Sequence, residues 1–108
     1  MRKFGSAVAV TVCCVLSGAA SAAPGDCANG THTTVTGTID SVSPPLGTAQ
    51  GYVWIKAQSL GECTVEVIEL GKGQQLPASC TKGGTVSASG KVESDEYWVL
   101  HPETLSCQ

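Results

Sequence analysis

The sequence predicts a small all-β domain of five strands that is stapled by disulfide bonds. Polar and apolar residues alternate along several short segments, as they do in strands with one buried face. Stretches rich in glycine and proline separate these segments, and no repeats, heptads or long helical periods occur. Four cysteines follow an N-terminal export signal, and an even number in a short exported chain indicates a disulfide framework.

The first 22 residues are typical of a secretory signal peptide. Two basic residues precede an apolar run over residues 4–16, and the small-residue motif Ala20-Ser21-Ala22 follows it. We expect cleavage before Ala23. The apolar run is shorter than the ~20 residues that span a bilayer. The sequence therefore predicts a single mature domain, residues 23–108, that is periplasmic or secreted and has no membrane partner after signal removal.

The expected mature domain is acidic. Its four cations are all lysines and it carries nine carboxylates, so its net charge is −5 with both histidines neutral. Nucleic acids are bound mainly by lysine and arginine side chains that neutralise phosphates, and anionic membranes attract basic segments in the same way. The charge therefore argues against a nucleic-acid partner and against a membrane surface.

The first strand is expected from about Thr34 to Val42. Val35, Gly37 and Ile39 share one face, which we expect to be buried, and polar residues alternate with them. A glycine at an inward position indicates a bend or a close backbone approach. A loop over residues 43–51 follows, because its two prolines cannot donate to a strand ladder.

A hairpin over residues 52–70 lies at the centre of the chain, with its turn at residues 60–62. Alternation along its first strand directs one set of side chains towards the core, namely Val53, Ile55 and Ala57. The opposite face mixes large aromatic side chains with polar ones, which a plain solvent face rarely does. These outward residues are Tyr52, Trp54, Lys56 and Gln58.

The second strand of this hairpin changes phase along its length. Val65 and Val67 share one face, and the opposite face carries Thr64, Glu66 and Ile68. Ile68 and Leu70 then alternate out of step with the two valines. A β-bulge near Ile68-Glu69 would explain the change.

A connection over residues 71–84 precedes the last two strands. Residues 76–81 can form one short helical turn, which would pack Leu76 and Ala78 under the sheet. The fourth strand is expected over residues 85–92, with an inward set of Val86, Ala88, Gly90 and Val92.

An acidic turn, residues 93–96, leads into a fifth strand from Tyr97 to about Cys107. Pro102 interrupts this strand, which indicates a bend or an unpaired edge segment. Trp98 shares the phase of Leu100, which favours a place in the core.

This order of elements resembles the OB-fold, in which three meandering strands and a connection precede a two-stranded hairpin. Residues 34–39, TVTGTI, are similar to the usual first OB strand, and residues 84–92, GTVSASGKV, are similar to the usual fourth. The resemblance covers nearly all of the mature chain and is nearest to small exported bacterial OB-fold-like proteins. It implies a Greek-key barrel in which the first strand pairs with both the second and the fourth. A β-sandwich or a small lipocalin-like inhibitor barrel is the alternative.

The resemblance also implies a ligand face. OB-folds bind across strands two and three, flanked by the loops between strands one and two and between strands four and five. On this chain the flanking loops are residues 44–51 and 93–96, and the implied surface is Tyr52, Trp54, Lys56, Thr64, Glu66 and Ile68. Nucleic-acid OB-folds carry a basic groove beside stacking aromatics, whereas this face has Lys56 alone beside an acidic loop. The candidate ligands of this face are therefore oligosaccharides, peptides, small ligands or a protein partner.

The residues favour a binding module over an enzyme. No serine stands in a G-x-S-x-G motif. Glu66 and Glu69 are three apart on a strand, so they point to opposite faces unless a bulge intervenes. No catalytic residue and no cofactor are predicted. The predicted function is an exported module that binds an oligosaccharide, a peptide or a small ligand. The alternative is a protein-interaction or inhibitor domain acting on an extracytoplasmic protein. Tyr52 and Trp54 either form a stacking platform, or they cap the edge of the barrel or pack on the proline-containing loop.

The four cysteines expected in disulfides are Cys27, Cys63, Cys80 and Cys107. They form no C-x-x-C pair and no recurring spacing with either histidine, so no metal site is predicted. The sequence alone allows three pairings. The OB-like topology brings the starts of the first and third strands to one end of the barrel. The resemblance therefore implies Cys27–Cys63, with Cys63 opening the third strand, and Cys80–Cys107 at the other end.

Overall fold

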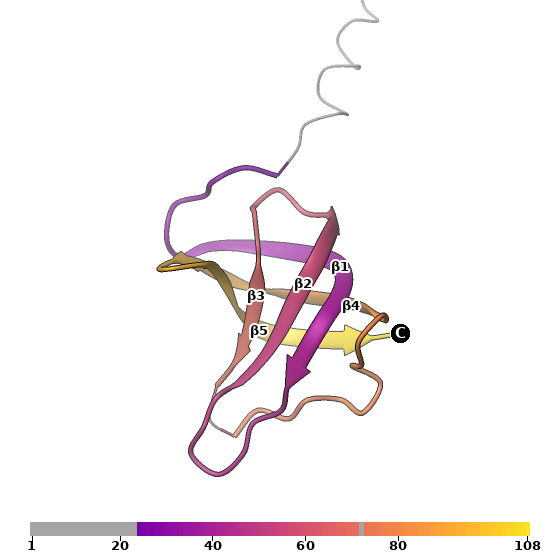
Figure 1. Ribbon diagram of the computed structural model, residues 1–108. Coiled ribbons are helices and arrows are strands. Elements are labelled where there is room, and N and C mark those ends of the chain that lie inside the picture. The colour runs from indigo at the N-terminus through magenta and orange to yellow at the C-terminus, as the bar shows by residue number, and fades with distance from the viewer. Residues whose placement is uncertain (1–23, 72) are drawn as a thin grey trace, which may run out of the picture.

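Five strands close into a β-barrel in the computed structural model, which describes residues 24–71 and 73–108 (Figure 1). The strands are β1 (Thr31–Ser43), β2 (Gly51–Leu60), β3 (Val67–Leu70), β4 (Thr85–Ser94) and β5 (Trp98–Cys107). Around the barrel they follow the order β1-β2-β3-β5-β4, and β1 pairs with β4 to close it. β3 runs parallel to β5, and the other neighbours are antiparallel. The all-β class and the pairing of the first strand with both the second and the fourth are confirmed. The predicted signal peptide lies outside the described residues.

β1 pairs with both β2 and β4, because it is long and bends in the middle. Its N-terminal part pairs with β4 and its C-terminal part pairs with β2, with register shifts on either side of Gly37. A Cβ atom built on Gly37 would lie 2.6 Å from Cγ2 of Ile55 and 2.9 Å from the carbonyl oxygen of Ala57. Only glycine fits there, so the predicted close backbone approach is confirmed.

The core is filled by alternate side chains of the strands, as the period-two pattern predicted. The side chains of Val35, Val53, Val86, Val92 and Leu100 are fully buried there, and Trp98 packs against them as expected. Ala57, near the end of β2, was predicted to point towards the core, but its side chain is exposed. β3 pairs with β2 only from Gly51 to Trp54, so the later residues of β2 have no strand beside them on that edge.

The third strand begins later than predicted, and the predicted bulge is wrong. β2 and β3 pair in continuous register from Val67 to Leu70. Ile68 and Leu70 point into the core, whereas Val67 is buried outside the core cluster and pairs with Trp54. Val65 lies in the core but precedes the strand. The change of phase therefore falls between Val65 and Val67, and the predicted outward position of Ile68 is wrong.

The side chain of Gln58 replaces the missing part of the ladder. Its Nε2 donates to the carbonyl of Cys63 at 2.8 Å, and its Oε1 accepts from the backbone N–H of Val65 at 3.0 Å. Because these partly buried backbone groups are satisfied by a side chain, residues 61–66 need not pair as a strand. Cys63 instead forms an isolated parallel bridge with Gly25 in the N-terminal segment.

β4 and β5 approach closely where Pro102 bends β5. The register shifts between Ser89 and Gly90, so that Glu103 is the extra residue of a bulge. Of the two outcomes predicted for Pro102, the structure has the bend. A Cβ atom on Gly90 would overlap the carbonyl oxygen of His101, so this position also requires glycine.

Two disulfides join distant positions of the chain. Cys27 joins Cys63 in the segment that follows β2, and Cys80 joins Cys107 at the end of β5, with Cα separations of 5.5 and 5.1 Å. Both predicted pairings are confirmed, and both are consistent with an extracellular or oxidising environment.

The connection between β3 and β4 contains a turn in place of the expected helical turn. The N–H of Cys80 donates to the carbonyl of Pro77 at 3.0 Å, and the surrounding residues are irregular. Leu76 packs against the core as expected, but Ala78 is exposed. In the part of the chain that the structure describes, no helix is long and apolar enough to cross a membrane.

Candidate functional site

An open groove of about 380 Å³ lies on the outer face of the barrel. β2, β3 and β5 form its base, and the loop before β2 and the turn between β4 and β5 form its sides. We call it the aromatic groove. It is lined by Gln50, Tyr52, Trp54, Val67, Glu69, Asp95, Glu96, Tyr97 and Val99.

Two aromatic rings from distant parts of the sequence meet in this groove. Alternation along β2 directs Trp54 outward, and Tyr97 stands at the bend where β4 turns into β5. Their ring centroids are 5.0 Å apart and the rings are nearly perpendicular, at 88°. This edge-to-face arrangement is a favourable one for aromatic pairs. Tyr97 nevertheless stays 47% exposed, so the pair remains open to solvent.

The floor of the groove is apolar. Val67 pairs with Trp54 in the β2–β3 ladder and with Val99 in the β3–β5 ladder. Only 2% of Val67 is exposed although it lies outside the core cluster. The outer face of the barrel therefore has a small hydrophobic layer of its own beneath the aromatic rings.

The rest of the lining is polar, and its charged groups are all acidic. Glu69 comes from β3, and Asp95 and Glu96 come from the β4–β5 turn. Among the residues that the structure describes, no lysine or arginine lines the groove. The side chain of Glu69 is only 16% exposed, so this carboxylate is largely shielded from water.

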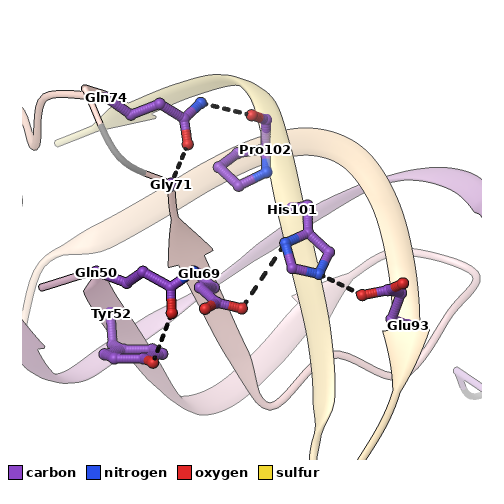
Figure 2. A network of polar contacts seen from close by, with 8 residues as sticks. All are labelled: Gln50, Tyr52, Glu69, Gly71, Gln74, Glu93, His101 and Pro102. Atoms are coloured by element: carbon purple, nitrogen blue, oxygen red, sulfur yellow. Dashed lines mark hydrogen bonds and ion pairs between the residues drawn. The ribbon is translucent and has the colours of Figure 1, made fainter. Parts of the chain in front are cut away.

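Polar contacts at the edge of the groove involve residues of four strands, β2, β3, β4 and β5 (Figure 2). The hydroxyl of Tyr52 donates to Oε1 of Gln50 at 3.4 Å. On the other side of Glu69, the ring of His101 lies between two carboxylates. Its Nδ1 is 3.8 Å from Glu69 and its Nε2 is 2.7 Å from Glu93 (Figure 2).

The structure brings only part of the predicted ligand surface together. Tyr52 and Trp54 line the groove, and the two predicted flanking loops contribute Gln50 and the acidic residues of the β4–β5 turn. Lys56 and Thr64 do not line it. Glu66 is also outside the lining, and its Oε1 accepts from the backbone N–H of Trp98 at 2.9 Å, which fixes the start of β5. Ile68 is fully buried in the core.

Sequence reasoning missed Tyr97, Val67, Glu69 and Val99. The position of Tyr97 directly after the acidic turn was a usable signal, because that turn was already expected to flank the ligand face. Val67 gave no such signal, since its alternation with Val65 indicates a shared face. Its true position depends on the phase change that Gln58 makes possible.

A second groove of about 450 Å³ lies near the start of β1 and the end of β2. It is lined by His32, Thr33, Thr34, Leu60, Gly61 and Glu62. Among the described residues that line it, Leu60 is the one large apolar side chain, with 64% exposed, and none is aromatic. The aromatic groove is smaller, but its walls carry more groups that can recognise a ligand.

Nothing in residues 24–71 and 73–108 groups three or more histidine, cysteine or acidic side chains in a way that could hold a metal ion. Comparison of the chain with protein-family models, curated proteins and solved structures finds no match. The function is therefore argued from the geometry of the aromatic groove.

Proposed function

We propose that this protein is an exported binding module that holds its ligand in the aromatic groove. The main support for this proposal is the Trp54–Tyr97 pair, which stays open to solvent beside the buried side chain of Val67. Exposed aromatic side chains are costly to leave in water, and a concave site with aromatic walls and a few polar groups is the common form of a ligand pocket.

The position of the groove supports the resemblance to OB-folds. The strand order β1-β2-β3-β5-β4 is compatible with that topology. The groove lies over β2 and β3 between the β1–β2 loop and the β4–β5 turn, where OB-folds bind ligands.

The competing interpretation, in which the aromatics pack on the proline-containing loop, has less support. Pro45 sits against the backbone of Gly51, where even a Cβ atom would be within 2.5 Å of the proline ring. Trp54 stacks against Tyr97 of the opposite turn. The loop contributes Gln50 to the rim of the groove.

Two disulfides and the predicted signal peptide support a periplasmic or secreted location. The open shape of the groove suits part of a chain-like molecule, so an oligosaccharide or a peptide is the expected ligand class. A protein-interaction or inhibitor role is favoured if the bound peptide is a segment of a larger protein. Net charge speaks against nucleic acid.

Nuclear magnetic resonance with a panel of neutral oligosaccharides and short peptides tests this proposal. We expect at least one probe to shift the indole N–H signal of Trp54 and the amides of the β4–β5 turn. Trp54→Ala should weaken that binding at least about tenfold. The control is Leu60→Ala, which removes an exposed apolar side chain from the second groove and should leave binding unchanged. The proposal is wrong if probes perturb only the second groove, or if Trp54→Ala leaves their binding unchanged.

A further inference from the structure

We infer that the aromatic groove recognises a lysine or arginine side chain of a partner polypeptide. This inference rests on the proposed function and narrows its ligand. It combines two observations on the same groove, the unbalanced negative charge of its lining and the open aromatic faces above it. Either feature alone would fit many ligands, and their combination selects a cation.

Among the described residues, the charged side chains that line the groove are all negative. Glu69, Asp95 and Glu96 line the groove and no lysine or arginine does. Lys56 lies on the same face of β2 but outside the groove. Carboxylates that face a shared concave surface repel one another, and a bound cation removes that repulsion.

Glu69 is the least exposed of the three carboxylates that line the groove. Most of its side chain is covered, and among the described residues its one ionic neighbour is His101, at 3.8 Å. His101 makes its shorter contact, 2.7 Å, to Glu93 through Nε2. At 3.8 Å, Nδ1 of His101 is too far from Oε1 of Glu69 for a hydrogen bond, so this carboxylate can still accept one from an incoming cation. Figure 2 shows the ring of His101 between Glu69 and Glu93.

The aromatic side chains supply the second half of the recognition. Ammonium and guanidinium groups are attracted to the faces of tryptophan and tyrosine, and guanidinium groups also stack on them. Trp54 and Tyr97 meet edge to face, an arrangement in which one edge covers one face and leaves the other ring faces to a ligand. Tyr52 lines the same wall and its hydroxyl is directed towards Gln50. The apolar stem of a lysine or arginine would lie over Val67, with its charged end near Glu69.

A polypeptide partner fits the dimensions and the charge of the protein. A volume of about 380 Å³ accepts a long side chain with a little of its backbone. The net charge of −5 on residues 23–108 attracts basic partners over a distance, in addition to the contact itself. We therefore expect a short basic segment, with one lysine or arginine entering the groove.

The test uses the mature domain with oxidised disulfides and four probes. These are a short peptide containing arginine, the same peptide with glutamine in place of arginine, the same peptide with glutamate, and a neutral oligosaccharide. Binding is measured by calorimetry at low and at physiological salt. The groove variant is Glu69→Gln, Asp95→Asn and Glu96→Gln combined. The matched control carries Asp26→Asn, Asp40→Asn and Glu62→Gln, which change the net charge equally at exposed positions outside the aromatic groove.

We expect the arginine peptide to bind at least about tenfold more tightly than the glutamine and glutamate peptides. The groove variant should lose about tenfold in affinity, the control variant much less, and Trp54→Ala about tenfold. Added salt should weaken the binding.

Three results would overturn the inference. If the glutamine peptide or the oligosaccharide binds as tightly as the arginine peptide, and Trp54→Ala removes that binding, the cation is wrong and the binding module stands. If the arginine peptide binds equally to the groove and control variants, its attraction is a general effect of net charge and not of this groove. If no probe binds, the inference is also overturned, and the module itself is then judged by the wider panel described above.

Discussion

Gln58 hydrogen-bonds Val65 as a neighbouring strand would. Its Oε1 accepts the N–H of Val65 at 3.0 Å, while its Nε2 donates to the carbonyl of Cys63 at 2.8 Å. One side-chain amide thus takes the place of a peptide group between two buried residues. This allows the chain to leave the ladder after β2 and to enter β3 with a new phase, which directs Ile68 into the core and Val67 towards the groove.

Replacing this amide should destabilise the barrel. Gln58→Ala leaves a partly buried donor and a partly buried acceptor without partners, at a cost of about 1–3 kcal/mol. Gln58→Glu keeps the acceptor for Val65 but sets a carboxylate against the carbonyl of Cys63, so it should be at least as destabilising. Chemical denaturation measures both, with Gln75→Ala at an exposed position as the control. A loss below about 0.5 kcal/mol for Gln58→Ala would show that the substitute ladder is dispensable.

Gly90 should tolerate no side chain. A Cβ atom there would overlap the carbonyl oxygen of His101 at the bulge of β5, and relieving it must shift the β4–β5 ladder. We expect Gly90→Ala to cost about 3 kcal/mol. Gly25→Ala is the matched control, because a Cβ at Gly25 meets no atom within 4 Å. Equal melting temperatures for the two variants would contradict the close approach.

Each disulfide should contribute similarly to stability. The bridges join residues separated by 36 and 27 positions. Loops of these lengths give about 3.5–4 kcal/mol each in the chain-entropy model. We expect the double variants Cys27→Ala with Cys63→Ala, and Cys80→Ala with Cys107→Ala, to lose similar stability. Full reduction should unfold the domain or nearly so, because the total free energy of unfolding of a small domain is only about 5–15 kcal/mol.

Circular dichroism with and without a reductant measures these losses. A reduced domain that melts at the same temperature as the oxidised one would contradict the expected contribution of the bridges.

The contact between Trp54 and Tyr97 should be measurable as a coupling energy. A double-mutant cycle with Trp54→Ala and Tyr97→Ala should give about 0.5–1.5 kcal/mol, the usual value for an edge-to-face pair. A cycle between Trp54→Ala and Leu60→Ala should give a coupling near zero, since Leu60 lines the other groove. The single variants should remain folded, because both rings lie outside the core cluster. Unfolding of Trp54→Ala would show that this ring is a packing residue.

The protein should not bind single-stranded nucleic acid at physiological salt. Its net charge of −5 over residues 23–108 opposes the release of counterions that drives such binding. Fluorescence anisotropy with a labelled oligonucleotide checks this expectation. A micromolar affinity that falls steeply with added salt would contradict it.

Much of the barrel follows from local patterns that sequence reasoning detects. Strands β1 and β4 alternate cleanly, and Gly37 and Gly90 interrupt them with inward glycines where backbones approach. The disulfide pairing followed from the topology that the OB-fold resemblance implied. These features depend on residues close in sequence or on the order of the strands.

The features that sequence reasoning missed depend on single side chains acting at a distance. Val65 and Val67 alternate like residues of one strand, yet the bonds made by Gln58 separate their faces. Tyr97 belongs to the groove because the β4–β5 turn folds towards β2, where it meets Trp54. No periodicity records either contact. The predicted outward positions of Tyr52 and Trp54 therefore agree with the structure, and that of Ile68 does not.

The positions of the two disulfides also determine how the domain responds to mechanical force. A pull on its two ends follows the covalent path, which passes directly from Cys27 to Cys63 and from Cys80 to Cys107. In the oxidised domain only the stretch of about 17 residues between Cys63 and Cys80 can lengthen, to ~60 Å. Without the disulfides, the about 80 residues from Cys27 to Cys107 could lengthen to ~280 Å. β1, β2, β4 and β5 all lie inside the two bypassed loops. An oxidised domain held under tension between two surfaces would therefore extend through β3 and the connection, while its four long strands cannot be drawn out.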